Sequence, residues 1–155
     1  MLLQTSKTFD RLALARQPRF KILQGGSSSS KTFSILQYLV LLALKSDKPK
    51  LVSIVAETLP ALRRGALRDF INILGDQYDV RQHNKSEGTY RIGRWLFEFF
   101  GADNSSRLRG ARRNILFINE CNNVKFEAYS QLEMRTSEKF FLTSTLRVNS
   151  GYTMN

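Results

Sequence analysis

The sequence predicts an α/β fold in which a mainly parallel sheet is flanked by helices. Short apolar runs alternate with longer amphipathic ones, and two of the short runs, 51–56 and 114–118, are rich in branched aliphatic residues. Such runs are typical of strands buried on both faces, and strands that alternate with helical segments favour a parallel sheet. With 155 residues, of which 42% are hydrophobic, the chain is long enough for one domain with a core.

The first half of the chain is expected to contain two strands, each followed by a helix. The strands cover residues 20–23 and 51–56, and the first helix covers residues 32–44. Pro60 fits the first turn of the second helix, and Gly75 fits its end. This helix should bury one face, formed by Leu62, Leu67, Phe70, Ile71 and Leu74.

The second half is expected to add a strand-like piece, a hairpin around Gly93-Arg94, a loop, a buried strand, a helix and the start of a last strand. These elements cover, in order, residues 78–80, 89–92 with 95–100, 101–106, 114–118, 126–134 and 140–142.

A loop rich in glycine and serine lies between the first strand and the first helix. Its sequence, Gln24-Gly25-Gly26-Ser27-Ser28-Ser29-Ser30-Lys31-Thr32, closely follows the phosphate-binding pattern G-x-x-x-x-G-K-[ST] in a strand-loop-helix context. The backbone N–H groups from Gly25 to Thr32 would surround the phosphates of a nucleotide at the positive end of the helix dipole. Lys31 would add a point charge on the transferred phosphate, and the Thr32 hydroxyl would ligate Mg²⁺.

One position departs from this pattern, because Ser30 stands where the second glycine is expected. If the backbone there requires a positive φ, a residue other than glycine costs about 1–2 kcal/mol, which phosphate binding could offset. The alternative is a flexible serine-rich linker in front of a helix, with a serine as the N-cap.

The charge of the chain favours an anionic partner. The sequence has 24 Lys and Arg residues against 13 Asp and Glu residues, a net charge of +11. Such a charge attracts polyanions and makes binding sensitive to salt. A solvated basic surface without a ligand is the alternative.

The single cysteine and the single histidine limit other chemistries. Cys121 cannot form a disulfide within the chain, and we expect it to be a small buried hydrophobic residue. His83 is expected in a solvated loop over 82–85, and no cluster of metal-ligating residues is apparent. The N-terminus lacks a long apolar stretch, so we expect a cytoplasmic protein without a membrane partner.

A second motif lies at the end of the predicted strand 114–118. The strand is followed by Asn119 and Glu120, the layout of a Walker B element. In motor ATPases the first polar residue helps to hold Mg²⁺, and the Glu that follows activates the attacking water. Asn119 replaces the usual Asp; its amide can orient a metal-bound water but lacks the charge. The alternative is an ordinary strand followed by polar residues.

Together, the two motifs resemble those of an additional-strand P-loop ATPase and, more specifically, of the large subunit of phage terminase, the motor that packages DNA into procapsids. The resemblance covers most of the chain. Beyond the phosphate loop, it rests on residues 58–65, 97–103, 106–110, 116–122 and 131–136. Asn before Glu is a variant associated with this family.

The resemblance implies a P-loop NTPase fold of the additional-strand type, incomplete at the C-terminus, with ATP and Mg²⁺ as cofactors. Lys31 and Glu120 would be catalytic, and Thr32 and Asn119 would hold the ion, Asn119 directly or through water. The implied partners are double-stranded DNA, a terminase small subunit, a portal protein and further copies of the chain in a ring.

The resemblance also implies an arginine that one subunit donates to the γ-phosphate of its neighbour. Arg107 and Arg109 stand where related terminases carry such a residue; a contact with a phosphate backbone or plain surface charge is the alternative. Three further arginines, Arg63, Arg64 and Arg68, share a helix end and could touch DNA or a neighbour.

The resemblance ends near Leu142, which predicts a partial ATPase domain over 1–142 and an unstructured tail over 143–155. Terminase large subunits continue with a D-F-N-P segment, then F-W, then a nuclease domain that is expected to be absent here. A back-translation of residues 143–155, shifted by one base, reads D-F-N-P-A-S-E-F-W-L-H-D, so the hypothesis is a frameshift near Thr143. The competing interpretation is that Thr143-Ser144-Thr145 is a native Ser/Thr coupling motif, as in related motors and helicases.

The predicted function is therefore that of a terminase motor region, with hydrolysis of ATP by this product left open and no nuclease activity expected. One alternative is a non-catalytic, basic nucleic-acid-binding or assembly fragment. Another is a different P-loop motor, such as a helicase.

Overall fold

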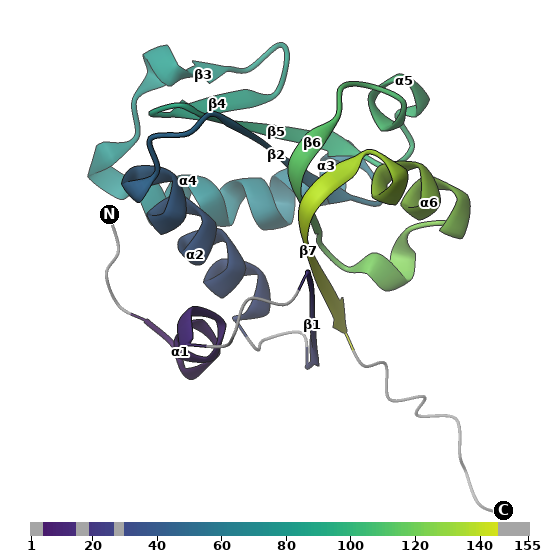
Figure 1. Ribbon diagram of the computed structural model, residues 1–155, viewed down its shortest axis with the longest axis horizontal. Helices are drawn as coiled ribbons and strands as arrows, with labels where there is room; N and C mark the ends of the chain where they lie inside the picture. The colour runs from purple at the N-terminus through teal and green to yellow at the C-terminus, as the bar shows by residue number, and fades with distance from the viewer. Residues whose placement is uncertain (1–4, 15–18, 27–29, 146–155) are drawn as a thin grey trace, which may run out of the picture.

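The computed structural model describes residues 5–14, 19–26 and 30–145, which form a layered α/β fold. One sheet of seven strands, in the order β1-β7-β6-β2-β5-β4-β3, lies between two groups of helices (Figure 1). The first five strands of this order are parallel, and β4 and β3 are antiparallel at one edge. The strands are β1 (Phe20–Gly25), β2 (Lys50–Ala56), β3 (His83–Asn84), β4 (Thr89–Ile92), β5 (Trp95–Gly101), β6 (Arg113–Ile118) and β7 (Thr136–Thr145).

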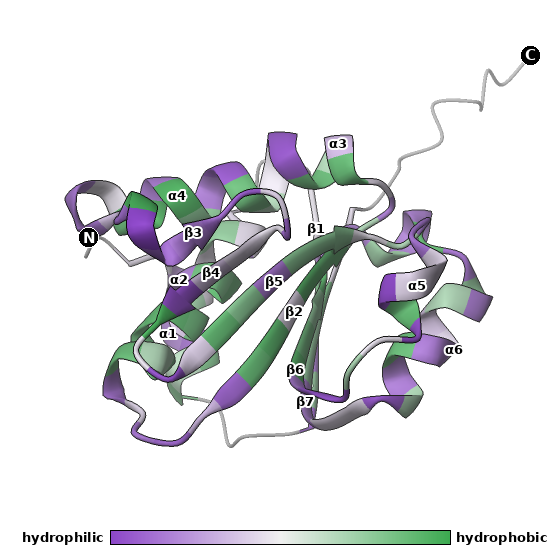
Figure 2. Ribbon diagram, turned by 90° about the horizontal axis from the view of Figure 1, so that it is seen from above, coloured by the Kyte–Doolittle hydropathy of each residue, from purple (hydrophilic) through white to green (hydrophobic). Residues whose placement is uncertain are grey.

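Helices cover both faces of this sheet. They are α1 (Lys7–Leu14), α2 (Lys31–Lys45), α3 (Leu59–Leu62), α4 (Arg68–Leu74), α5 (Ser105–Leu108) and α6 (Phe126–Met134), with a π-helical turn, Arg63–Leu67, between α3 and α4. The larger apolar core contains residues of α1, α2 and α4, and the smaller one contains residues of α5 and α6. Figure 2 shows these two groups on opposite sides of the mainly hydrophobic central strands.

The predicted fold class is confirmed. The strands expected at 20–23, 51–56 and 114–118 are β1, β2 and β6, and the hairpin expected around Gly93-Arg94 is formed by β4 and β5. The helix over 126–134 is α6, with the same bounds. Strand β7 lies between β1 and β6 and runs parallel to both, so it is the additional strand that the resemblance implied.

Two local predictions near the hairpin are wrong. Residues 78–80 do not form a strand, because the Asp79 side chain accepts a hydrogen bond from the Arg81 backbone and starts a 3-10 turn over Val80–Gln82. His83 is not in a solvated loop: it forms β3 with Asn84, and its Nδ1 lies 2.6 Å from Tyr78 Oη. Burial lowers the pKa of this histidine, and the nearby Lys85 charge adds to the effect.

The second helix has a different buried face from the one expected. Leu62, Phe70 and Leu74 are buried as predicted, whereas Leu67 and Ile71 are only half-buried. A π-helical turn inserts one extra residue into the helical repeat and so rotates the residues after it. The core therefore takes up Ala66 and Ile73 as well.

Strand β7 extends past the boundary expected after Leu142. Thr143, Ser144 and Thr145 pair with Leu23, Gln24 and Gly25 of β1. The expected tail is therefore wrong for these three residues, because the pairing with β1 and the burial of Thr143 place them inside the sheet. The rest of that tail, residues 146–155, lies outside the described residues.

Candidate functional site

Three adjacent parallel strands end at the same edge of the sheet and bring the predicted motifs together. Strand β1 leads into the glycine–serine loop, and β6 is followed by Asn119 and Glu120. Strand β7 lies between them and ends in Thr143-Ser144-Thr145. The carboxyl ends of parallel strands are where open α/β sheets bind ligands, so this edge is the candidate site.

The loop after β1 has a left-handed backbone at the position where the motif has glycine. Ser30 adopts φ 55° and ψ 15° directly before α2. The strain anticipated for a non-glycine residue is therefore present. Ser30 is the N-cap residue of α2, as the alternative interpretation expected for a serine, but its side chain makes no capping hydrogen bond. Ser27, Ser28 and Ser29 lie outside the described residues.

Lys31 is the first residue of α2, and its ammonium group is held by the loop. Its Nζ donates to the carbonyl oxygens of Gly25, at 3.1 Å, and Gly26, at 2.7 Å. The side chain is buried rather than extended into solvent. The positive charge is therefore kept at the loop where the motif places a phosphate.

Thr32 and Asn119 join the two sequence motifs directly. Thr32 Oγ1 donates to Asn119 Oδ1 over 2.6 Å. The same amide oxygen accepts from Thr143 Oγ1 at 3.0 Å. A hydroxyl and an amide oxygen therefore lie together at the place predicted for Mg²⁺. Oxygen donors suit this ion, which is commonly held by one or two protein groups together with phosphates and waters.

Within the part of the chain that the structure describes, no group of three or more His, Cys, Asp or Glu residues could hold a metal ion. The hydroxyl of Thr32 and the amide oxygen of Asn119 are donors of the kind that Mg²⁺ takes when phosphates and waters supply its other ligands.

Glu120 also has a left-handed backbone, with φ 55° and ψ 56°. Its backbone N–H donates to Thr143 Oγ1 over 2.9 Å. Its carboxylate Oε1 accepts from Thr145 Oγ1 over 2.7 Å. A strained residue persists only where its surroundings hold it in place, and here the two threonines of β7 do so.

No pattern in the sequence predicted a contact of Thr143 or Thr145 with Glu120. The one feature of the sequence that pointed toward such a contact was Thr143-Ser144-Thr145, if it is interpreted as a native Ser/Thr coupling motif. The pairing partner of β7 decides the contact, and strand order is not visible in a local pattern.

A cavity of about 280 Å³ opens beside the two residues that follow β6. A Cβ on Gly65, in the π-helical turn, would lie 3.4 Å from Asn119 Nδ2, so a small residue leaves room there. The cavity is lined by Ala56, Glu57, Ala61, Arg64, Gly65, Asn119, Glu120 and Asn123.

The three arginines of the second helix do not act as one cluster. Arg64 lines the cavity beside Glu120. Arg63 lines a larger cavity of about 760 Å³ between α3, the hairpin and α5. The side chain of Arg68 pairs with Asp69 at 3.6 Å.

Arg107 and Arg109 lie in different surroundings. Arg107 Nη1 lies 3.6 Å from Glu98 Oε2, its other terminal nitrogen donates to the Glu87 carbonyl, and its guanidinium covers the Phe100 ring at 5.8 Å. Arg109 is exposed, and its Nε donates weakly to Ser105 O over 3.4 Å. Of these two arginines, Arg109 is the one whose side chain is exposed.

Cys121 follows Glu120 and is half-buried rather than fully buried. It packs at the edge of the smaller core. Burial raises the pKa of its thiol, and the Glu120 carboxylate raises it further. The thiol form is thus favoured, which fits a packing role and not a nucleophile.

Known proteins resemble this chain in structure and not in sequence. No protein-family model matches the sequence, and no curated protein matches it. The solved structures do match: the ATPase domains of large terminases share this fold over most of the chain.

The large terminase of a thermophilic bacteriophage matches with a TM-score of 0.73 and 20% identity, over 89% of this chain and 37% of the terminase. The same terminase in complex with ATP-gamma-S matches with a TM-score of 0.72 and 18% identity, over 89% of this chain and 36% of that one. This chain therefore spans little more than a third of the length of that protein.

Two further solved structures each match over 94% of this chain. The ATPase domain of the Thermus phage P74-26 large terminase has a TM-score of 0.64, with 15% identity over 67% of that domain. The Phi-28 gp11 DNA packaging motor has a TM-score of 0.57, with 13% identity over 53% of its chain. At these identities the likeness is one of fold.

Among the helices that the structure describes, none is long and apolar enough to cross a membrane.

Proposed function

We propose that this chain is the ATPase motor region of a phage terminase large subunit, which binds and hydrolyses ATP to drive double-stranded DNA into procapsids. The proposal rests on the 2.6 Å contact between Thr32 and Asn119, because it joins the two motifs that nucleotide binding and hydrolysis require. The fold shared with terminase ATPase domains supports it, and the complex of one relative with ATP-gamma-S supports ATP as the ligand.

Each motif residue has a separate task in this proposal. The backbone from Gly25 to Thr32 would surround the phosphates. Lys31, whose Nζ now donates to the carbonyls of Gly25 and Gly26, would donate to phosphate oxygens instead. Thr32 and Asn119 would hold Mg²⁺, which would supply positive charge to the phosphate oxygens. Glu120 orients the attacking water and accepts its proton.

The threonines of β7 connect the general base to the strand beside it. The hydrogen bond from Thr145 restrains the Glu120 carboxylate, and Thr143 bonds to Asn119 and Glu120 at once. These contacts favour the interpretation of residues 143–145 as a native coupling motif. A gene sequence without a terminase frame downstream would rule out the frameshift hypothesis.

Arg109 is the arginine that we assign to the neighbouring subunit's γ-phosphate. It is exposed, whereas Arg107 is occupied by Glu98 and by the Glu87 carbonyl. An arginine supplied by a neighbour stabilises the charge that develops in the transition state. The proposal therefore includes a ring of copies, together with duplex DNA, a small subunit and a portal protein as partners.

Steady-state ATPase assays test the roles of the two motifs. Lys31→Ala is expected to abolish tight nucleotide binding. Glu120→Gln is expected to keep binding and to lower kcat by about 10²–10⁴-fold, the usual range for a general base. Glu127→Gln, an exposed carboxylate on α6, is the matched control and should retain wild-type activity. Binding of ATP with no turnover in the wild-type chain would support the non-catalytic alternative instead.

A mixing experiment tests the trans arginine. Arg109→Gln and Glu120→Gln should each be inactive alone, while a mixture should regain activity, because some interfaces then pair an intact Glu120 with an intact Arg109. A mixture as inactive as its components would contradict this assignment. Stimulation by a portal protein rather than by single-stranded DNA separates a terminase motor from a helicase.

A further inference from the structure

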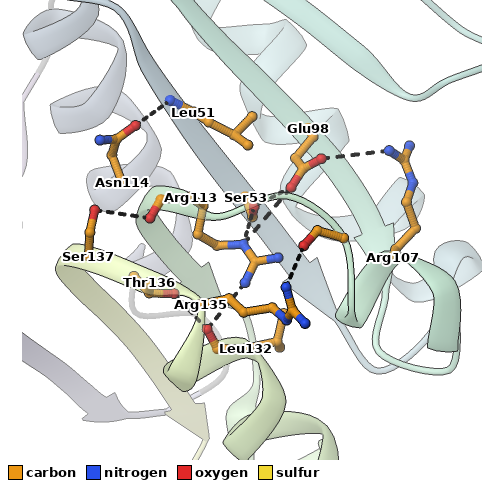
Figure 3. Close-up of polar contacts among 11 residues, drawn as sticks. Leu51, Ser53, Glu98, Arg107, Arg113, Asn114, Leu132, Arg135, Thr136 and Ser137 are labelled. Carbon is orange, nitrogen blue, oxygen red and sulfur yellow. Dashed lines mark hydrogen bonds and ion pairs between the residues drawn. The ribbon is translucent and has the colours of Figure 1, made fainter.

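A chain of polar and charged side chains crosses the sheet face that α5 and α6 cover (Figure 3). Arg113, the first residue of β6, is 1% exposed. Its Nε donates to Ser53 Oγ of β2 over 2.7 Å, and the Ser53 hydroxyl donates to Glu98 of β5. The Arg113 Nε also lies 4.0 Å from Glu98 Oε1. A terminal nitrogen of Arg113, Nη1, donates to Leu132 O over 3.2 Å.

This cluster is an unfavourable way to fill a core. Arg113 Nη2 is buried and has no hydrogen-bond partner among the described residues. Burial lowers the pKa of the Arg113 guanidinium from its ordinary value, and the Glu98 carboxylate opposes this shift. Apolar residues of similar volume are often at least as stabilising as a buried ion pair. A contribution to stability therefore does not by itself explain why these residues are buried here.

The chain of contacts continues from the sheet to α5. The second oxygen of Glu98 pairs with Arg107 Nη1 at 3.6 Å, so one carboxylate is shared by a buried arginine of β6 and an arginine of α5. Arg107 O in turn accepts from the backbone N–H of Gly110 over 3.1 Å. The pairing with Glu98 therefore fixes Arg107, which lies two positions before Arg109, to the sheet.

The other side of that segment is held as well. Arg135, directly after α6, donates from Nη1 to Gly110 O over 3.1 Å, and its own carbonyl accepts from the Arg113 backbone N–H over 2.9 Å. Leu108 is buried, whereas the side chains of Arg109 and Arg112 remain exposed. The segment 105–112 is thus fixed on the sheet through Arg107, Leu108 and Gly110, and it presents Arg109 outward.

We propose that Arg113, Ser53, Glu98 and Arg107 are positioning residues, which set the place of segment 105–112 and thereby aim Arg109 at the nucleotide of a neighbouring copy. This inference rests on the proposed ATPase function. The two arginines of this segment then have different roles. Arg109 contacts the phosphate, and Arg107 acts indirectly by holding Arg109 in place. A misplacement of a catalytic group by about 1 Å can lower the rate about a hundredfold. Residues that fix the position of Arg109 would therefore preserve the rate of hydrolysis.

The test uses Arg107 because the obvious alternatives endanger folding. Glu98→Gln would leave the buried charge of Arg113 unpaired, which is strongly destabilising. Arg107→Gln removes the guanidinium contacts with Glu98, the Glu87 carbonyl and the Phe100 ring. The buried charge of Arg113 still faces Glu98, and the Arg107 side chain is 32% exposed, so the fold should tolerate the change. Arg107→Lys keeps a positive charge near Glu98. Arg91→Gln, an exposed arginine on β4, is the matched control.

Hydrogen exchange measures the positioning independently of catalysis. In the full chain, Arg107→Gln is expected to raise the exchange rates of the amides at 108–112 by about tenfold, since contacts that hold this segment are lost. Amides of β6 should keep their wild-type rates. The exchange rates at 108–112 in Arg107→Lys should lie between those of the wild type and Arg107→Gln. In Arg91→Gln these rates should match the wild type. Unchanged exchange at 108–112 in Arg107→Gln would overturn the proposal.

Kinetics then test whether the position matters for the reaction. Arg107→Gln is expected to lower kcat about tenfold to a hundredfold with an unchanged KM for ATP, and mixing it with Glu120→Gln should restore turnover as for Arg109→Gln. Faster exchange with an unchanged kcat would also overturn the proposal. If the wild-type chain does not hydrolyse ATP, the ATPase function fails, and the exchange rates at 108–112 alone decide whether Arg107 positions the segment.

Discussion

Strained backbone occurs at one residue in each motif of the candidate site. Among the described residues, Ser30 and Glu120 are the two non-glycine residues with positive φ. Ser30 ends the phosphate loop, and Glu120 follows the strand β6. Strain of this kind clusters at functional sites. Its occurrence at these two positions supports the location of the site independently of the motif patterns.

Replacing Ser30 by glycine should relieve one of these strains. Glycine adopts the left-handed region without a Cβ penalty, so Ser30→Gly is expected to raise the free energy of unfolding by about 0.5–1 kcal/mol. The Ser30 side chain makes no capping hydrogen bond that the change would remove. Urea denaturation measures the effect. Ser30→Ala keeps the strain and is the control; equal stability of the Gly and Ala variants would contradict the expectation.

Cys121 should report the charge of its neighbour Glu120. Burial raises the pKa of the thiol and the Glu120 carboxylate adds to this, so less reactive thiolate is present at a given pH than in a free cysteine. We expect iodoacetamide to modify the folded protein more slowly at about pH 8, near the ordinary pKa of a thiol, than the unfolded chain, and Glu120→Gln to accelerate the reaction. Mass spectrometry follows it. Equal rates in folded and unfolded protein would refute the prediction.

At the scale of elements, an aromatic cluster joins α4 to the hairpin. The Phe70 ring lies 5.1 Å from Phe97 and Phe99 and 5.5 Å from Tyr90, measured between ring centroids. Phe70 is fully buried. The π-helical turn before α4 sets which residues of the helix face these rings. The helix and the hairpin are therefore expected to be lost together when the cluster is weakened.

Phe70→Ala is expected to lower the free energy of unfolding by about 3–5 kcal/mol, since it removes buried surface and leaves a cavity. Phe126→Ala is the control, because Phe126 is 75% exposed; it should change the stability by less than about 0.5 kcal/mol. Chemical denaturation measures the free energy of unfolding of both variants, which can be compared if the dependence on denaturant concentration is the same. A loss at Phe70 no larger than at Phe126 would show that the cluster does not hold the hairpin.

At the scale of the whole molecule, the order of the strands brings the site together, and the chain carries a large positive charge. Strand β7 lies between β1, which leads into the phosphate loop, and β6, which leads into Asn119 and Glu120. The Thr143 hydroxyl of β7 therefore contacts both residues that follow β6. The net charge is +11, and Arg63, Arg64 and Arg109 are among the exposed arginines that carry it. An excess of exposed positive charge suits a polyanion.

Binding to duplex DNA should therefore weaken steeply with salt. Each phosphate that the protein neutralises contributes about 0.9 to the slope of log affinity against log salt. We expect fluorescence anisotropy with a labelled duplex to show a strong loss of affinity between roughly 50 and 200 mM salt. Lys31→Ala, a nucleotide-site variant, should leave this slope unchanged. Affinity that does not respond to salt would contradict a charge-driven contact.

The local pattern of the sequence determined most elements and the motif residues. Apolar runs at 51–56 and 114–118 predicted β2 and β6, because the period of burial is a property of neighbouring residues. The departure at Ser30 was visible for the same reason, since the motif prescribes the backbone of each position. The errors at 78–80 and at His83 arose where a side chain, Asp79, started a turn that a hydrophobic pattern does not encode.

Only the tertiary structure decided which strands lie beside one another. Thr145 reaches Glu120 because β7 is inserted next to β6, and Glu98 joins Arg113 to Arg107 because β5, β2 and β6 are neighbours. These residues lie on different elements, and their polar contacts depend on register and burial. Such pairing is set by the packing of the whole sheet, so no local pattern could predict it.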